Sequence, residues 1–104
     1  MAAARRDQLE RELAHWLPRA PSWEAGEIVA HCLHSRSLAR LPAAAAVKLA
    51  AAAFVRHTFT DYDALLTEGW GPEAARHAVA QAIDAKLAEW GATRPLTGRM
   101  EEPC

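Results

Sequence analysis

Residues 42–63 read PAAAAVKLAAAAFVRHTFTDYD, and this stretch decides the fold. Pro42 suits the first turn of a helix that begins near Ala43, because the N–H that proline lacks would have no partner there. The alanines that follow are the strongest helix formers. The expected buried side of this helix consists of Val47, Ala50 or Ala51, Phe54 and Val55. The stretch therefore predicts a long helix at the centre of the fold.

Three other segments show the same helical pattern. The chain is expected to be helical over 5–17, from an N-cap at Ser22 onward, and from Pro72 to a closing Gly91. Their inward-facing residues, at helical spacing, are expected to be Leu9, Leu13, Trp16, Leu17, Ala25, Ile28, Val29, Cys32, Leu33, Ala75, Val79, Ile83, Leu87 and Trp90.

Turn signals divide these helices, and no strand signal accompanies them. Gly69 suits the left-handed conformation that ends a helix, and residues 35–41, rich in Ser and Arg, are expected to form a loop. The sequence has no alternating run of β-branched residues and no Asn-Gly or Asp-Gly turn. The expected fold class is therefore all-α, a compact bundle of four or five helices. The helix that begins near Ala43 and the last helix are expected to form its centre.

Length and composition limit the domain organisation. The 104 residues suffice for one domain, expected at 1–92, and residues 93–104 are expected to form a disordered tail. Hydrophobic residues make up 51% of the chain, which is too many for a disordered protein. Much of that fraction is alanine, which buries little area. The core must therefore depend on a few large side chains, and its helices are expected to approach closely.

Charge and cysteine usage exclude several classes of protein. The net charge of −1 gives no general attraction to nucleic acid or membranes. Cys32 and Cys104 form no Cys-x-x-Cys pair, a usage typical of a reducing compartment. The N-terminus lacks the apolar run of a signal peptide, and the apolar stretch 43–55 is too short to span a bilayer. We expect a cytoplasmic protein with no membrane partner and no cofactor.

The polar segment Arg56–Asp63 follows the apolar part of the central helix and allows two local structures. In the first, the helix ends near Thr58, and Thr60 and Asp63 form a Thr-x-x-Asp capping box that starts a new helix. Two β-branched threonines near the junction slightly favour such a break. Whichever local structure forms, the favoured interpretation of the polar groups is a network of caps and ion pairs that fixes a helical corner.

In the second structure the central helix continues to Glu68, and its polar face pairs His57 with Asp61 four residues later. A functional reading makes His57 a general base that Asp61 holds in one tautomer. Arg56 would hold an anionic group, and Asp61 with Asp63 would hold a divalent cation. Catalytic groups usually come from distant segments, and no such partner is identifiable. The sequence therefore leans away from an enzyme without deciding the question.

Two histidines suggest a weaker metal site. His31 and His34 lie three residues apart on a helix face that also carries two glutamates, and His57 from the next helix would supply a third ligand. An exposed polar face is the commoner origin of such a pair. A metal-dependent enzyme that uses His57, Asp61 and one of these histidines is the second alternative function.

A phosphate or nucleic-acid site is the first alternative function. No acidic residue lies in the stretch 28–60, where the cations are Arg36, Arg40, Lys48 and Arg56. A loop, a helix start and a helix end would then form one positive face. Nonspecific nucleic-acid binders usually carry more cations and a basic net charge, so this function is not favoured.

The four tryptophans lie at helix ends or in turns, at Trp16, Trp23, Trp70 and Trp90. Each would either anchor a partner or seal one end of an alanine-rich core. Sealing is the favoured role.

Several stretches between Leu13 and Trp90 carry a family resemblance. They are Trp16–Pro21 with its aromatic-x-Pro-x-x-Pro pattern, Ile28–His31, Phe54–Leu66 with an Arg-His-x-x-Thr-Asp-Tyr-Asp string, and Glu73–Val79. In these stretches the chain resembles the bacterial and fungal family known as domain of unknown function 2293. The resemblance implies no known activity. It gives added weight to Arg56, His57, Thr60, Asp61, Tyr62, Asp63 and Arg76.

The chain departs from the family pattern in two places. Residues Ser35–Arg40 stand where the family often has a Gly-Arg-Val-Gly-Arg-like loop. Trp90 is followed by Gly91, where the family has Trp-Arg. No role of that loop is therefore carried over to this chain.

The leading functional prediction is a non-enzymatic binding or interaction domain with its site around Arg56–Asp63. A dense polar cluster without a recognisable catalytic set motivates this prediction. Arg76 is expected to reach Asp61 or Asp63 if the last helix packs beside this segment. The partner would be an unidentified protein or a second copy of the chain.

Overall fold

Six helices make up the computed structural model, which describes residues 2–96. They are α1 (Ala2–Trp16), α2 (Ser22–His34), α3 (Arg36–Ala39), α4 (Ala43–Phe59), α5 (Tyr62–Thr67) and α6 (Pro72–Glu89). No strand occurs in this part of the chain. The all-α fold class is confirmed, with six helices where four or five were expected.

The additional helix α3 corrects the prediction of a loop at 35–41. It is a single turn that begins after Ser35, whose hydroxyl accepts a hydrogen bond of 3.3 Å from the backbone N–H of Leu38. The side chain of Leu38 is buried in the core. A local cap and one buried leucine thus suffice for a turn of helix that is too short to show a periodic pattern.

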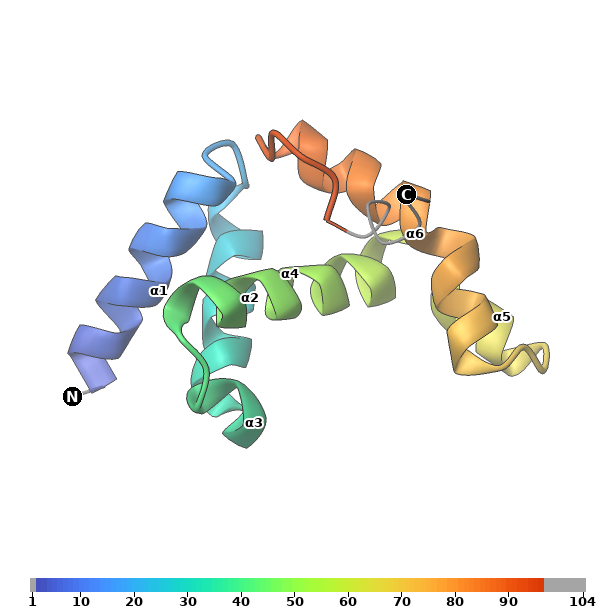
Figure 1. Cartoon of the computed structure of the whole chain (residues 1–104), viewed down its shortest axis with the longest axis horizontal. Helices are drawn as coiled ribbons and strands as arrows, with labels where there is room; N and C mark the ends of the chain where they lie inside the picture. The colour runs from blue at the N-terminus through green and yellow to red at the C-terminus, as the bar shows by residue number, and fades with distance from the viewer. Residues whose placement is uncertain (1, 97–104) are drawn as a thin grey trace, which may run out of the picture.

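Helix α4 is the centre of the molecule and packs against each of the other five helices. Figure 1 shows it crossing the middle, with α1 and α2 on one side and α5 and α6 on the other. Helix α6 contacts α4 and α5 but neither α1 nor α2, so the prediction that the last helix shares the centre is wrong. Two halves of the fold are therefore joined mainly through one helix.

The core contains most of the residues that helical spacing placed inward. The predicted residues that are buried are Leu9, Leu13, Leu17, Ile28, Val29, Cys32, Val47, Ala50, Ala51, Val55, Ala75, Val79, Ile83, Leu87 and Trp90. Trp16, Ala25, Leu33 and Phe54 are half-buried against it. Ala46, Ala51 and Ala75 have no exposed surface, which shows that the helices meet closely where their side chains are small.

Helix α4 ends at Phe59, and α5 begins at Tyr62, so the first of the two structures considered for this segment is the correct one. Thr60 has an extended backbone, with φ −130° and ψ 174°. Its hydroxyl accepts a hydrogen bond of 3.1 Å from the N–H of Tyr62 and donates one to the carbonyl of Arg56. The expected capping box is not formed. The N-cap of α5 is Asp61, whose side chain makes no capping bond, and the Asp63 carboxylate bonds His57 instead.

Two glycines end helices in the conformation that glycine favours. Gly69 follows α5 with φ +101°, and Gly91 follows α6 with φ +116°. The turn between α1 and α2 supplies hydrogen-bond donors to the C-terminal end of α6. The N–H of Arg19 donates to the carbonyl of Trp90 at 2.8 Å, and its guanidinium donates to the carbonyls of Glu89 and Ala88. The last carbonyls of α6 are therefore satisfied from a distant segment.

The chain beyond α6 turns back along that helix. The N–H of Leu96 donates to the Asp84 carboxylate at 2.8 Å, and the Leu96 side chain packs against the core. The rest of the expected tail, residues 97–104, lies outside the described residues. Within residues 2–96, no helix is both long enough and apolar enough to cross a lipid bilayer.

Candidate functional site

The corner between α4 and α5 brings His57, Tyr62 and Asp63 together. Nδ1 of His57 lies 2.8 Å from a carboxylate oxygen of Asp63, a hydrogen-bond distance. The His57 ring packs edge-on against Tyr62 with 5.3 Å between the ring centroids. Tyr62 is buried, whereas the His57 and Asp63 side chains are half-exposed. The buried ring and the carboxylate therefore fix the orientation of the exposed histidine.

Arg56 packs against Tyr62 at the same corner. Its guanidinium carbon lies 5.2 Å from the centroid of the Tyr62 ring, within the range of a cation–π contact. The Nε atom of Arg56 is buried and has no hydrogen-bond partner. The guanidinium thus packs on Tyr62, and no carboxylate of residues 2–96 forms an ion pair with it.

The remaining predicted residues of this site are not all brought together. The Thr60 hydroxyl is used by its hydrogen bonds with the backbone of Arg56 and Tyr62. Asp61 is exposed and bonds neither His57 nor a cation among the described residues. Arg76 lies exposed on α6 and forms no ion pair with Asp61 or Asp63, so the expected contact is not made. The convergent part of the predicted set is therefore His57, Tyr62 and Asp63, with Arg56 behind them.

A half-open groove of about 240 Å³ lies between α2 and α4, beside this corner. Its lining consists of Glu27 and His31 from α2 and Ala50, Ala53, Phe54, His57 and Thr58 from α4. The alanines leave the space, because a larger side chain at either position would fill it. We refer to it as the α2–α4 groove. His57 belongs to both the corner and the groove.

Aromatic side chains continue from the groove across the surface. Trp23 packs against Phe54 with ring centroids 6.4 Å apart and ring planes tilted by 58°. Phe54 meets Phe59 at 6.1 Å, and Phe59 meets the buried Trp90 at 5.8 Å. The Trp23 side chain is 66% exposed, so this row begins at a surface ring and ends in the core.

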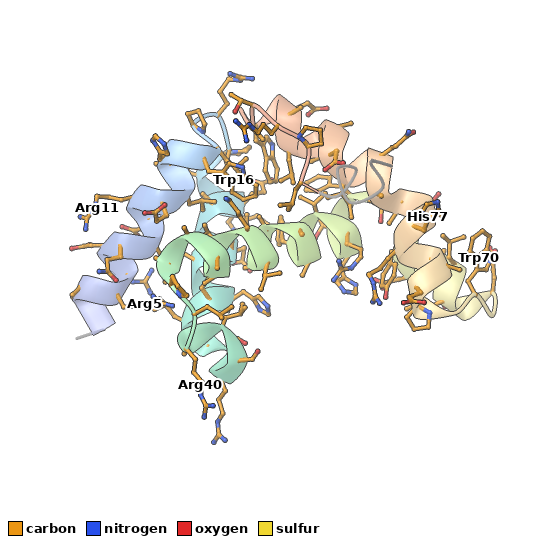
Figure 2. The ribbon with its side chains drawn as sticks, in the orientation of Figure 1. Arg5, Arg11, Trp16, Arg40, Trp70 and His77 are labelled. Atoms are coloured by element: carbon orange, nitrogen blue, oxygen red, sulfur yellow. The ribbon has the colours of Figure 1, made fainter. Side chains whose placement is uncertain are left out.

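The four tryptophans differ in burial. Trp90 is buried and Trp16 is half-buried, and both contribute to the core as expected of sealing residues. Trp23 and Trp70 are 66% and 44% exposed. Trp70 lies in the turn between α5 and α6, at the opposite end of the molecule from Arg40 (Figure 2).

The proposed metal site is not formed among the described residues. His31 lines the α2–α4 groove together with His57, but the exposed His34 does not. In residues 2–96, no group of three or more His, Cys, Asp and Glu side chains lies close enough to hold a metal ion. The three-ligand arrangement of His31 or His34 with His57 is therefore corrected by the structure, because the side chains do not converge.

The cations of the acid-free stretch are also separated. Arg36 and Arg40 lie at α3 and just after it, near the start of α4, whereas Arg56 lies near its end. A 17-residue helix is about 25 Å long, so these groups are at opposite ends of it. Lys48 faces another way, with its Nζ 6.0 Å from the ring centroid of Trp16. The structure does not gather these cations into one face.

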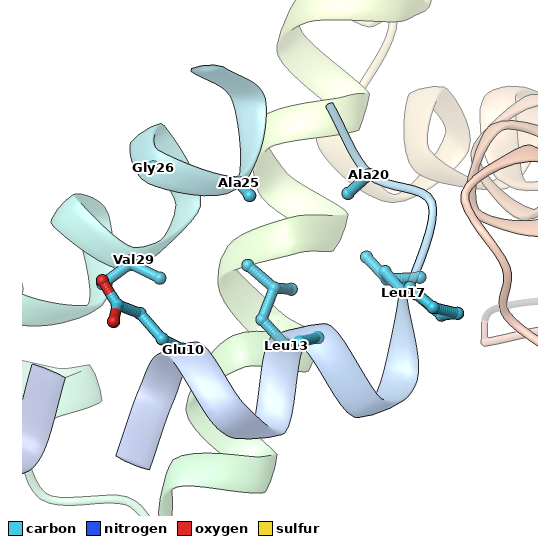
Figure 3. A pocket seen from close by; sticks show the side chains of 9 residues that line it. Glu10, Leu13, Leu17, Ala20, Ala25, Gly26 and Val29 are labelled. Atoms are coloured by element: carbon cyan, nitrogen blue, oxygen red, sulfur yellow. The ribbon is translucent and has the colours of Figure 1, made fainter. Parts of the chain in front are cut away.

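A second hollow, of about 170 Å³, lies between α1 and α2 (Figure 3). Leu13, Leu17 and Val29 give it an apolar lining, and Glu10 stands at its edge. The Glu10 carboxylate already has a cation, Arg6, at 4.0 Å. This hollow carries no other charged group and stands apart from the corner.

Sequence reasoning missed the part that Phe54, Ala50 and Ala53 play in the groove. Phe54 was assigned to the buried side of the central helix, although its ring also faces the groove. One signal was present in the sequence, because Trp23, Glu27 and His31 recur every four residues and so share one helix face. The groove itself depends on how α2 packs on α4, which that pattern does not specify.

The fold and its polar corner define a small all-helical domain. Residues 12–91 match a family described as an uncharacterized conserved protein (DUF2293). The chain therefore belongs to the domain of unknown function 2293 family, in agreement with the resemblance in its sequence. No curated protein and no solved structure matches the chain.

Proposed function

We propose that the domain is a non-enzymatic interaction module that binds a partner polypeptide at the α2–α4 groove and the adjoining corner. The observation that supports it best is the position of His57. Its ring lines the groove, while its Nδ1 is bonded to Asp63 and its edge rests on Tyr62. A side chain that is held in place by its neighbours and still half-exposed is suited to recognition, because little ordering remains to be done on binding.

The composition of the surface supports the same function. Exposed Trp23 and Phe59, which is 39% exposed, flank Phe54 at the groove. Aromatic side chains are enriched at the centres of protein interfaces. Polar groups of Glu27, His31 and His57 lie beside these rings. An apolar surface with a few placed polar groups is the usual composition of a recognition site.

Site-directed photocrosslinking tests this function. A benzoylphenylalanine in place of exposed Thr58, at the groove, is expected to give a specific adduct with a polypeptide in its native cell extract. The matched control is the same residue in place of exposed Ala78 on α6. The adduct from position 58 should weaken when His57→Ala or Asp63→Ala is added.

Mass spectrometry of the adduct identifies the partner, including a second copy of this chain. Equal adducts from positions 58 and 78, or none from position 58, would contradict the proposal. A measured turnover that depends on His57 would also contradict it, since the site would then be catalytic.

A further inference from the structure

We propose that the α2–α4 groove receives the ammonium group of a lysine side chain carried by the partner, in the angle between Trp23 and Phe54 and beside Glu27. This inference rests on the proposed function and specifies the chemistry of the partner. It follows from three observations, which concern the two rings, the cations of the protein itself, and the Glu27 carboxylate.

Phe54, which lines the groove, meets the ring of Trp23 at an angle. Their centroids are 6.4 Å apart and their planes are tilted by 58°, and Trp23 leaves most of its surface exposed. The face of an aromatic ring carries negative charge density and attracts a cation within about 6 Å, most strongly for tryptophan. A small cation in the angle between the rings would be attracted by both.

The protein's own cations cover other aromatic rings and leave this pair uncovered. Lys86 Nζ lies 4.5 Å from the centroid of Phe59, Arg56 lies over Tyr62, and Lys48 lies over Trp16. Neither Trp23 nor Phe54 has such a cation among the described residues. The fold thus makes repeated use of this contact and leaves its most exposed aromatic pair without one.

Glu27 supplies the complementary negative charge. It lies one helical turn after Trp23, on the same face of α2, and its side chain lines the groove. In residues 2–96 it forms no hydrogen bond or ion pair, whereas Glu10 at the other hollow is paired with Arg6. No Lys or Arg lines the groove. The charge of the site therefore favours a cationic partner group.

The shape of the site favours lysine over arginine. A planar guanidinium stacks flat on a single ring and pairs with a carboxylate through two parallel hydrogen bonds. An ammonium group is compact and approaches two tilted rings and one carboxylate together. The apolar floor of Ala50 and Ala53 suits the methylene chain that carries the ammonium group.

Peptide titration followed by NMR tests the inference. The probe is a capped alanine–serine peptide with a single central lysine, and the reporter is the indole N–H of Trp23, which is assigned by its loss in Trp23→Phe. We expect the lysine peptide to shift this resonance. Glu27→Gln should raise the Kd roughly fivefold, as expected for loss of one half-exposed charge contact. Trp23→Ala should abolish binding.

The matched control is Trp70→Ala, which removes another exposed tryptophan far from the groove and should leave the Kd unchanged. Failure of the lysine peptide to bind would overturn the inference. Equal binding of a norleucine peptide would also overturn it, because the site would then be merely apolar. Tighter binding of an arginine peptide would overturn the choice of lysine.

The photocrosslinking experiment separates failure of this inference from failure of the proposed function. An adduct from position 58 whose partner contacts the groove without a lysine would contradict the lysine assignment and leave the proposed function standing. Absence of a groove-specific adduct would contradict the proposed function, whether or not the lysine peptide binds.

Discussion

At the scale of the residue, His57 connects two arrangements that are otherwise separate. Asp63 binds its Nδ1, Tyr62 packs against its ring, and the side chain also lines the groove. An exposed pair such as His57–Asp63 stabilises a fold by at most about 1 kcal/mol. Its main consequence is therefore the fixed orientation of the imidazole, because a bond to one ring nitrogen determines the role of the other.

Cys32 shows how burial controls a single thiol. It lies on α2 with 1% of its surface exposed. Burial raises the pKa of this thiol above its ordinary value of 9.0, while the charge of Arg5 and a backbone hydrogen bond lower it to a smaller extent. The folded state therefore keeps the proton at pH values where the unfolded state loses it.

We predict that this thiol destabilises the fold at alkaline pH. Below pH 9 both states hold the proton and the contribution is constant, but above it the free energy of unfolding falls until the folded thiol also ionises. Urea unfolding between neutral and alkaline pH should give a steeper fall for the parent than for Cys32→Ala, with Cys104→Ser in both proteins. Parallel pH profiles would contradict the assignment.

At the scale of the element, helix ends were easier to predict than short helices. Pro72, Gly69 and Gly91 each act locally, so their positions in the sequence were sufficient to place the boundaries. Helix α3 was not predictable, because four residues give no periodicity and its stability depends on burial of Leu38. The break before α5 was only half determined, since its place was expected but the capping box was not formed: Asp61 is the N-cap, and Asp63 bonds His57.

The two glycines that follow α5 and α6 predict different sensitivities. Both have a positive φ, so alanine is strained at either position. At Gly69 an added Cβ would meet open space, whereas at Gly91 it would lie 2.6 Å from Cδ of Pro18. We expect Gly69→Ala to lower the free energy of unfolding by about 1–2 kcal/mol.

Gly91→Ala should lower the free energy of unfolding by about 1–3 kcal/mol more than Gly69→Ala does, because the turn at Pro18 must also move. Denaturant unfolding of the two variants measures the difference directly. Equal costs would show that the contact with Pro18 is relaxed in solution.

At the scale of the whole molecule, the sequence predicted the inside of the protein better than its surface. Helical spacing depends on residues within one element, and it placed most of the core residues correctly. The groove, the separation of the cations and the position of Arg76 depend on how helices are packed against each other. Arg36 and Arg56 belong to the same stretch without acidic residues, but they lie near opposite ends of α4. No spacing rule within a helix reports such distances.

Close helix packing predicts intolerance of larger side chains in the core. Ala51 has no exposed surface and lies on the central helix. Ala51→Leu should lower the free energy of unfolding by about 1–3 kcal/mol through overpacking. The control is Ala78→Leu on the exposed side of α6, which should change it by less than about 0.5 kcal/mol. Equal effects would mean that the core has room around α4.

The contacts of Arg19 with the end of α6 have a consequence for the order of folding. The turn between α1 and α2 supplies hydrogen bonds to carbonyls that lie about 70 residues later in the chain. During synthesis the ribosome releases this turn before it releases α6, but a small domain generally folds as a unit. Contacts of such sequence separation form late and slow the folding of a helical protein. The carbonyls at the end of α6 are therefore satisfied only when the first turn and the last helix of the chain have come together.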